Sequence, residues 1–190
     1  MPRMTPSEAL VETLVAEGIR DVFGIVGSAF MDALDPSPAA GIPFIPVAHE
    51  QAAAHAADGY ARVTGRPQAC IAQNGPGAAN FVSAITAAFW AHSPVVAITP
   101  ETGSMGIGTG GFQELDQIGI VQPVTKYARL VERADELEFE ADKAIELALS
   151  GRPGPVHLSI TGDVMGGPVP EPYGLAGKPA LRKVSPATPA

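Results

Sequence analysis

Val47-Ala48-His49-Glu50-Gln51 marks the point where an apolar, β-rich run, 44–47, meets an alanine-rich helical pattern that continues to Val63. Glu50 is therefore expected at the carboxyl end of a strand and in the first turn of a helix. Ligands bind at that edge of open parallel sheets. An acid in this position also has a purely structural use, because it lies favourably at the positive end of the helix dipole.

Other apolar runs alternate with helical patterns along the chain. Strands are expected at these residues: 22–26, 44–47, 68–72, 95–98 and 156–160. Helices are expected to begin at the capping box Thr5-Pro6-Ser7-Glu8 and to cover these further residues: 30–34, 50–63, 76–90 and 135–149. The alternation predicts an α/β fold, a doubly wound, mostly parallel sheet with helices on both faces. Pro46 weakens the prediction of the second strand, because proline cannot donate a backbone hydrogen bond to a neighbouring strand. The glycine-rich segment 101–111 is expected to have little local order.

Composition limits the classes of protein that remain. A chain of 190 residues can bury one good core, so we expect one domain, 4–165, followed by a linker or tail rich in proline and glycine, 166–190. The net charge of −8 argues against nucleic acids and anionic membranes as partners. The single cysteine, Cys70, excludes an internal disulfide and is interpreted as a small buried hydrophobe. No apolar run is long enough to cross a bilayer, which predicts a cytoplasmic protein.

Several side chains are interpreted as structural. The core is expected to contain three aromatic residues, Phe81, Phe89 and Trp90, and two histidines are expected to be structural, His92 and His157. His49 and His55 lack the spacing with acids or cysteines that a metal site needs, so no metal ligands are expected. The alanines of 50–63 suit close packing on a sheet or on a second subunit, and Asp58 and Arg62 are spaced as an ion pair.

The residues from His49 to Arg62, continuing to Thr64-Gly65, resemble the signature helix of thiamine-diphosphate enzymes related to acetolactate synthase. In that family the glutamate contacts the ring nitrogen of the aminopyrimidine, which gives Glu50 a catalytic and cofactor-binding role. A second motif, Gly75 to Asn80, is by itself a glycine turn opening a helix, and it matches neither a P-loop nor a dinucleotide fingerprint. In the family this turn packs beside the aminopyrimidine, and the resemblance implies that Pro76 and Asn80 shape the cofactor site.

A third motif, Phe112-Gln113-Glu114, is by itself an ordinary loop-to-helix junction. Related enzymes line the substrate pocket with this segment and with the turn that corresponds to Gly27-Ser28. The resemblance therefore implies four substrate-pocket residues: Gly27, Ser28, Phe112 and Gln113. It covers about residues 4–165 and is strongest to the sulfoacetaldehyde acetyltransferase branch. Acetolactate synthases more often carry Thr-Ser where this chain has Gln73-Asn74.

The resemblance implies that Glu50 shares a proton with the cofactor ring, and that sulfoacetaldehyde and phosphate give acetyl phosphate and sulfite. Family members need a second domain that holds the diphosphate through magnesium bound to a Gly-Asp-Gly motif. Here Gly162-Asp163 is followed by Val164 and is interpreted as the end of the last strand, so magnesium is expected only from the missing domain. The chain alone is expected to be inactive, as a fragment, a split subunit or a remnant.

Three hypotheses remain open on the sequence. The chain is the pyrimidine-binding domain of a sulfoacetaldehyde acetyltransferase, the same domain of an acetolactate synthase-like or decarboxylating enzyme, or a non-catalytic binding or assembly module. The first two require a complementary diphosphate-binding domain or subunit. They also imply a homo-oligomer, a dimer or tetramer, because family sites lie between two subunits. The alanine-rich helix is the expected contact.

Overall fold

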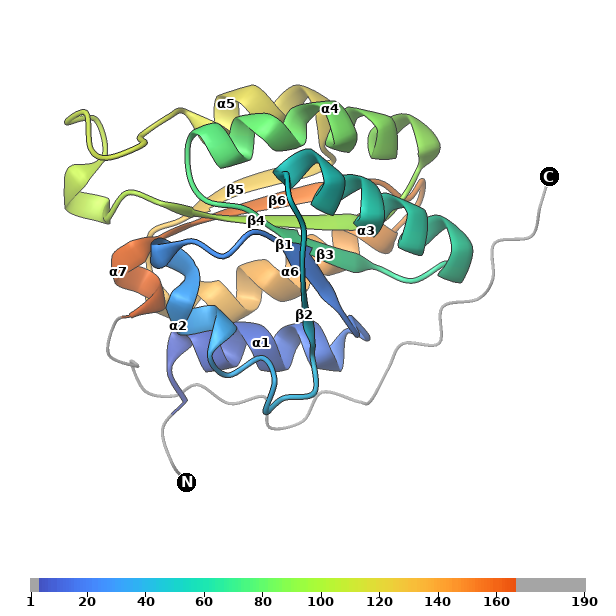
Figure 1. The fold of residues 1–190 in the computed structure, drawn as a ribbon, viewed down its shortest axis with the longest axis horizontal. Coiled ribbons are helices and arrows are strands. Elements are labelled where there is room, and N and C mark those ends of the chain that lie inside the picture. The colour runs from blue at the N-terminus through green and yellow to red at the C-terminus, as the bar shows by residue number, and fades with distance from the viewer. Residues whose placement is uncertain (1–3, 167–190) are drawn as a thin grey trace.

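The computed structural model describes residues 4–166, and within them six strands form one sheet between two layers of helices (Figure 1). The strands are β1 (Val22–Gly24), β2 (Phe44–Pro46), β3 (Gln68–Ile71), β4 (Val95–Glu101), β5 (Tyr127–Val131) and β6 (Val156–Thr161). Their order across the sheet is β2-β1-β3-β4-β6-β5, and all neighbouring strands are parallel.

Helices cover both faces of the sheet. They are α1 (Pro6–Ala16), α2 (Met31–Leu34), α3 (Glu50–Thr64), α4 (Pro76–Ala91), α5 (Gln117–Val121), α6 (Leu137–Leu149) and α7 (Gly162–Met165). Figure 1 shows α1, α2 and α6 on one face and α3, α4 and α5 on the other. The predicted doubly wound parallel fold is therefore confirmed.

The two faces have cores of different composition. Large aliphatic side chains fill the face under α1 and α6: Leu10, Leu14, Leu137, Ile145 and Leu158. Small residues dominate the other core, to which α3 and α4 contribute Ala53, Ala54, Ala57, Phe81, Ala84 and Ala88. Alanines let these two helices lie close to each other and to the sheet. The predicted use of the alanine run against a sheet is confirmed, as is the buried position of Phe81.

Several local predictions are also confirmed. Thr5 and Glu8 form the capping box, with Thr5 Oγ1 accepting the Glu8 amide at 3.2 Å and Glu8 Oε2 accepting the Thr5 amide at 2.7 Å. The Asp58 carboxylate accepts Arg62 Nε at 2.8 Å and the adjacent guanidinium nitrogen at 2.5 Å. Cys70 is fully buried, and burial raises the pKa of its thiol.

Other parts of the chain differ from the prediction. Strand β5 and helix α5 had not been predicted, because β5 is a half-exposed edge strand and α5 is only five residues long. Pro46 is accommodated because β2 is the opposite edge strand. Strand β4 runs through Pro100, where it pairs with Ile160 of β6 although pairing with β3 has ended at Ile98.

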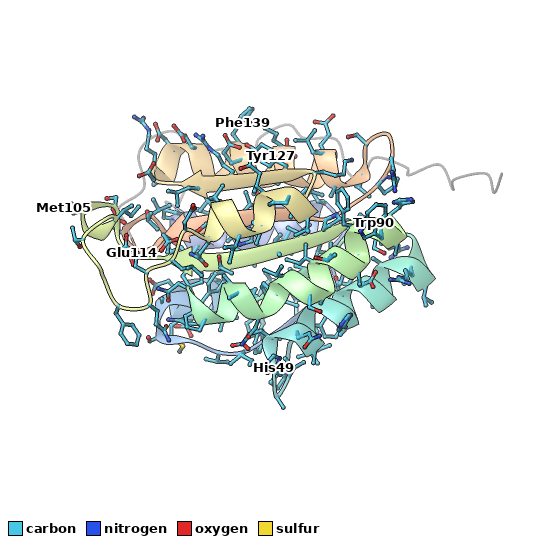
Figure 2. The ribbon with its side chains drawn as sticks, turned by 90° about the horizontal axis from the view of Figure 1, so that it is seen from above. His49, Trp90, Met105, Glu114, Tyr127 and Phe139 are labelled. Atoms are coloured by element: carbon cyan, nitrogen blue, oxygen red, sulfur yellow. The ribbon has the colours of Figure 1, made fainter. Side chains whose placement is uncertain are left out.

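The prediction that Trp90 belongs to the core is wrong. Its side chain is 70% exposed, and it lies near the end of α4, while Phe89 beside it is half-buried. Figure 2 shows Trp90 at one end of the sheet and Glu114 at the opposite end. No described helix is both long and apolar enough to cross a bilayer. The predicted linker or tail lies outside the described residues, apart from Gly166.

His157 lies within β6 and is fully buried, as expected of a structural histidine. Its Nε2 is 3.0 Å from the hydroxyl oxygen of Thr99 on the neighbouring strand β4. Its Nδ1 is buried and has no hydrogen-bond partner among the described residues. Burial lowers the pKa of His157 to about 4, so the imidazole is neutral at neutral pH.

The stability of the domain is therefore expected to fall as the pH drops below about 6.5. In that range an unfolded His157 takes up a proton while the folded one stays neutral, so the unfolded state binds more protons. Between pH 6.5 and 5 the free energy of unfolding should fall by about 1 kcal/mol per pH unit, below the limit of about 1.4 because the unfolded histidine is only partly protonated near its pKa. Urea unfolding across this range measures the slope. The slope should disappear in His157→Gln and persist in His55→Gln, an exposed histidine of α3; equal slopes in the two variants would contradict the prediction.

Candidate active site

The turns that follow the first four strands meet at one edge of the sheet. Because all the strands are parallel, the segments after β1, β2, β3 and β4 leave from their carboxyl ends on the same side. These segments are 25–28, 47–49, 72–75 and 102–114. They contain or adjoin every residue that the sequence predicted for the site except Asn80, which lies in the second turn of α4. The 102–114 loop extends beyond the sheet on the side where α4 begins (Figure 1).

Glu50 is the first residue of α3 and lies half-buried where β2 gives way to the helix. His49 precedes it as the N-cap, with Nδ1 accepting the amide of Gln51 at 3.2 Å. Glu50 Oε2 accepts a hydrogen bond from Asn80 Nδ2 on α4 at 2.9 Å. The other oxygen, Oε1, has no hydrogen-bond donor within residues 4–166. Asn80 thus orients the carboxylate and leaves one oxygen available.

The glycine turn before α4 gives the predicted motif its shape. Gly75 has φ +59°, a value that side-chain-bearing residues rarely adopt, and Pro76 takes the first position of α4. A Cβ on Gly77 would lie 3.5 Å from Glu50 Oε1, so the start of α4 lies directly beside the available oxygen. Asn80 contacts Glu50, whereas Pro76 is exposed in the first turn and makes no hydrogen bond to it.

The turn also contacts the predicted substrate segment. Asn74 is buried, and its Nδ2 donates to the carbonyl oxygens of Phe112 at 3.0 Å and Gln113 at 3.3 Å. Gly75 packs so closely that a Cβ there would lie 2.1 Å from the same Gln113 oxygen. Gln113 is half-buried, while the Phe112 side chain is 81% exposed. The glycine turn thus lies beside both Gln113, at Gly75, and Glu50, at Gly77.

Gly27 joins the cluster through a residue that the sequence had not assigned to the site. A Cβ on Gly27 would lie 2.1 Å from Gln73 Oε1, so the absence of a side chain at Gly27 makes room for Gln73. Ser28 begins the short 3-10 helix Ser28–Phe30 and makes no hydrogen bond to the other predicted site residues. Gln73 and Asn74 therefore link the two predicted substrate segments. The sequence signal that could have identified Gln73 and Asn74 as site residues is their position directly before Gly-Pro-Gly.

The expectation of little local order in 101–111 is wrong. The Glu114 carboxylate accepts the backbone amides of Gly108, Gly110 and Gly111, the last two at 2.7 and 2.9 Å. These bonds, that of Gly108 foremost, lower the pKa of Glu114. The loop is also compact around Thr102, whose methyl carbon would lie 2.7 Å from a Cβ on Gly111. Figure 2 shows Glu114 at the base of this loop and Met105 at its tip.

Asp163 anchors the other end of the loop instead of ending a strand as predicted. It lies in α7, and its two carboxylate oxygens accept the amide of Ser104 at 2.9 Å and its hydroxyl at 2.6 Å. Within residues 4–166, no three histidine, cysteine or acidic side chains gather as ligands of a metal would. Asp163 of Gly162-Asp163 thus uses its carboxylate to bind Ser104 of the loop.

The geometry around Glu50 fits the aminopyrimidine half of thiamine diphosphate. Glu50 Oε1 is an acceptor without a donor among the described residues, and a protonated ring nitrogen would satisfy it. Asn80 fixes the carboxylate from the other side at 2.9 Å. Gly77 of the neighbouring turn removes side-chain bulk next to that oxygen. The described residues offer no comparable set of groups for a diphosphate bound through a metal.

Comparisons with known proteins agree with this geometry. Residues 4–120 match the family described as "Thiamine pyrophosphate enzyme, N-terminal TPP binding domain". The sulfoacetaldehyde acetyltransferase of Alcaligenes xylosoxydans is 53% identical over 88% of this chain and 28% of its own length, and that of Castellaniella defragrans is 51% identical over 89% and 29%. A probable acetolactate synthase large subunit of Methanocaldococcus jannaschii is 38% identical over 97% and 32%.

The chain thus spans about a third or less of the length of these relatives. Its match to the family model nevertheless extends from Met4 through the three motifs to Ile120. The fold, the position of Glu50 and the glycine turn all belong to the matched region. The chain belongs to the thiamine pyrophosphate enzyme family, and it is the N-terminal, pyrimidine-binding domain through which such enzymes bind thiamine diphosphate.

Proposed function

We propose that this domain serves a sulfoacetaldehyde acetyltransferase, which converts sulfoacetaldehyde and phosphate to acetyl phosphate and sulfite. The observation that carries the proposal is the carboxylate of Glu50, held by Asn80 at 2.9 Å with its second oxygen available. The identities of 53% and 51% to two sulfoacetaldehyde acetyltransferases favour this branch of the family. A complementary domain or subunit supplies the magnesium and diphosphate site.

Glu50 acts on a proton. When bound, thiamine diphosphate supplies a carbon nucleophile for the carbonyl substrate, and the protein holds and tunes it. Glu50 Oε1 receives the hydrogen bond of the pyrimidine ring nitrogen and shares its proton, while Asn80 keeps the carboxylate in one orientation. Pro76 begins the helix that brings Asn80 to Glu50, and Gly77 after it keeps the approach to Oε1 open.

The substrate pocket is formed by the turns that flank this carboxylate. Gly27 and Ser28 border it from the end of β1, and Phe112 and Gln113 border it from the loop after β4. Gln73 and Asn74 connect these two sides. The assembly is a homo-oligomer, and the outer side of α3 contacts the second subunit, since the buried alanines of α3 already pack within the domain.

A second candidate function is the corresponding domain of an acetolactate synthase-like enzyme. The 38% identity to a probable acetolactate synthase large subunit supports it. Gln73-Asn74 weighs against it, because acetolactate synthases more often carry Thr-Ser before Gly-Pro-Gly. A non-catalytic binding or assembly module is the third candidate, and retention of the Glu50–Asn80 hydrogen bond weighs against it.

The three candidates are separated by assaying the chain with its complementary domain, magnesium and thiamine diphosphate. Acetyl phosphate formed from sulfoacetaldehyde and phosphate supports the first candidate, and acetolactate formed from pyruvate supports the second. Cofactor binding without either product supports the third. The chain alone is expected to show no turnover with either substrate. Full activity of the chain alone would overturn the requirement for a second domain.

A further inference from the structure

Gln113 has an unusual backbone. Its φ is +56°, and among the described non-glycine residues only His92 also has a positive φ. His92 occupies the C-cap of α4, a position where the left-handed conformation is common. Gln113 is itself a predicted site residue and lies away from any helix end, and such a conformation persists only where its surroundings enforce it. The structure must therefore supply contacts that hold Gln113.

Asn74 supplies the first set of contacts. Its Nδ2 donates to the carbonyl oxygens on both sides of the strained φ and ψ pair, those of Phe112 at 3.0 Å and Gln113 at 3.3 Å. Asn74 is 4% exposed, so its donating amide is shielded from competing water. Gly75 allows the approach, because a Cβ there would lie 2.1 Å from the Gln113 oxygen. The turn before α4 thus fixes the peptide that follows Gln113.

Glu114 supplies the second set. Its carboxylate accepts three backbone amides of the preceding loop, those of Gly108, Gly110 and Gly111. Hydrogen bonds to an ionised acceptor are stronger than those between neutral groups. The backbone amide of Glu114 also donates to the carbonyl oxygen of Gly111 at 3.1 Å, so the chain on the other side of Gln113 is held in a turn.

We propose that Asn74 and Glu114 are positioning residues that hold Gln113 in its left-handed conformation, so that the substrate meets a preformed pocket wall. The inference rests on the proposed function, in which Gln113 lines the substrate pocket. Gln113 Oε1 is buried and has no hydrogen-bond partner among the described residues. The same amide carries an NH₂ group, a donor suited to the acceptor oxygens of a sulfonate substrate. Loss of either positioning residue would then weaken substrate binding without altering the cofactor contact at Glu50.

Amide hydrogen exchange of the full chain tests the backbone part of the proposal. Asn74→Ala and Glu114→Gln should each speed exchange at residues 108–113 by about tenfold. Asp116→Asn is the matched control, because Asp116 Oδ1 also accepts a backbone amide, that of Gly119 at 2.8 Å, but lies outside the loop. Exchange at 108–113 in Asp116→Asn should equal that of the unaltered chain. Unchanged exchange in Asn74→Ala and Glu114→Gln would overturn the proposal.

Gln113→Gly provides a suppressor test. Glycine adopts a positive φ without strain, so this change should keep or increase protection of the loop. Combined with Asn74→Ala, it should bring exchange back to within about threefold of the unaltered chain. If Gln113→Gly alone speeds exchange as much as Asn74→Ala does, the Gln113 side chain holds the loop, and the positioning role of Asn74 is wrong.

Kinetics of the complete enzyme test the pocket part. Asn74→Ala and Glu114→Gln should raise the KM for sulfoacetaldehyde by about tenfold, with the Kd of thiamine diphosphate unchanged. The double variant Gln113→Gly, Asn74→Ala should still have a raised KM although its loop is again protected from exchange. The reason is that the Gln113 side chain, which contacts the substrate, is absent. An equal loss of cofactor affinity would overturn the assignment to the substrate side. If the complete enzyme acts on neither substrate, the proposed function fails, while the exchange data still decide whether Asn74 and Glu114 hold Gln113.

Discussion

Glu50→Gln is expected to lower the kcat of the complete enzyme by at least about 100-fold, the scale of a lost general acid–base group. Glutamine keeps the shape of the side chain, and its amide oxygen can still accept the hydrogen bond that Asn80 now donates at 2.9 Å. The position of Glu50 Oε1 is then occupied by an NH₂ group, which can neither accept a hydrogen bond from the ring N–H nor take its proton. The variant should fold normally, because the lost helix-dipole contribution is below about 1 kcal/mol.

The measurement is steady-state formation of acetyl phosphate from sulfoacetaldehyde, accompanied by thermal unfolding of each variant. Glu138→Gln is the matched control, because Glu138 is also an acid in the first turn of a helix, α6, away from the site. Asn80→Ala keeps the Glu50 carboxylate but removes the hydrogen bond that orients it. Its kcat should fall by about tenfold. Near-normal activity of Glu50→Gln would overturn the assignment of Glu50, whichever thiamine-dependent substrate is used.

The sequence was sufficient for the fold because five of the six strands in the described region carry clear apolar runs. Strand β5 escaped prediction because it lies at the sheet edge, where half-exposed positions weaken the pattern. Trp90 was assigned to the core on residue type alone, although its position at the last turn of α4 leaves it 70% exposed. Residue type predicts average burial, whereas the position of a residue in its helix determines the actual value.

The sequence located Glu50 and Asn80 through motifs, and the structure places the two side chains in contact. It did not identify Gln73 or Asn74 as contact residues, because their partners lie on other loops, and it did not assign the Glu114 carboxylate to the amides of its own loop. Asn74 meets a segment 38 residues away, and no local pattern encodes that contact. The 101–111 loop was expected to have little local order because it is rich in glycine. Here the glycines expose backbone amides to one carboxylate, that of Glu114, and the loop is ordered by hydrogen bonds.

Gly75→Ala is expected to reduce the free energy of unfolding by at least about 2 kcal/mol, through a strained backbone and a steric clash together. Gly75 has φ +59° and ψ −106°, a conformation that residues with a Cβ rarely adopt. The added methyl would lie 2.1 Å from the Gln113 carbonyl oxygen and 3.0 Å from its carbon. Both atoms belong to the backbone, so no side-chain rotation relieves the overlap. Either the turn before α4 or the Gln113 segment has to move.

Gly65→Ala is the comparison for a positive φ without a steric clash. Gly65 has φ +66° and ψ 16°, the left-handed helical region, at the C-cap of α3, and no atom lies within 4 Å of a Cβ placed there. It should therefore show left-handed strain alone, about 1 kcal/mol in urea unfolding. The additional cost at Gly75 measures the contact with Gln113 together with the greater strain of its ψ of −106°, and hydrogen exchange at residues 112–114 should rise only in Gly75→Ala. Equal losses of stability in the two variants would mean that the turn and the substrate segment are not in contact, and the pocket wall would then have to be supported by Glu114 alone.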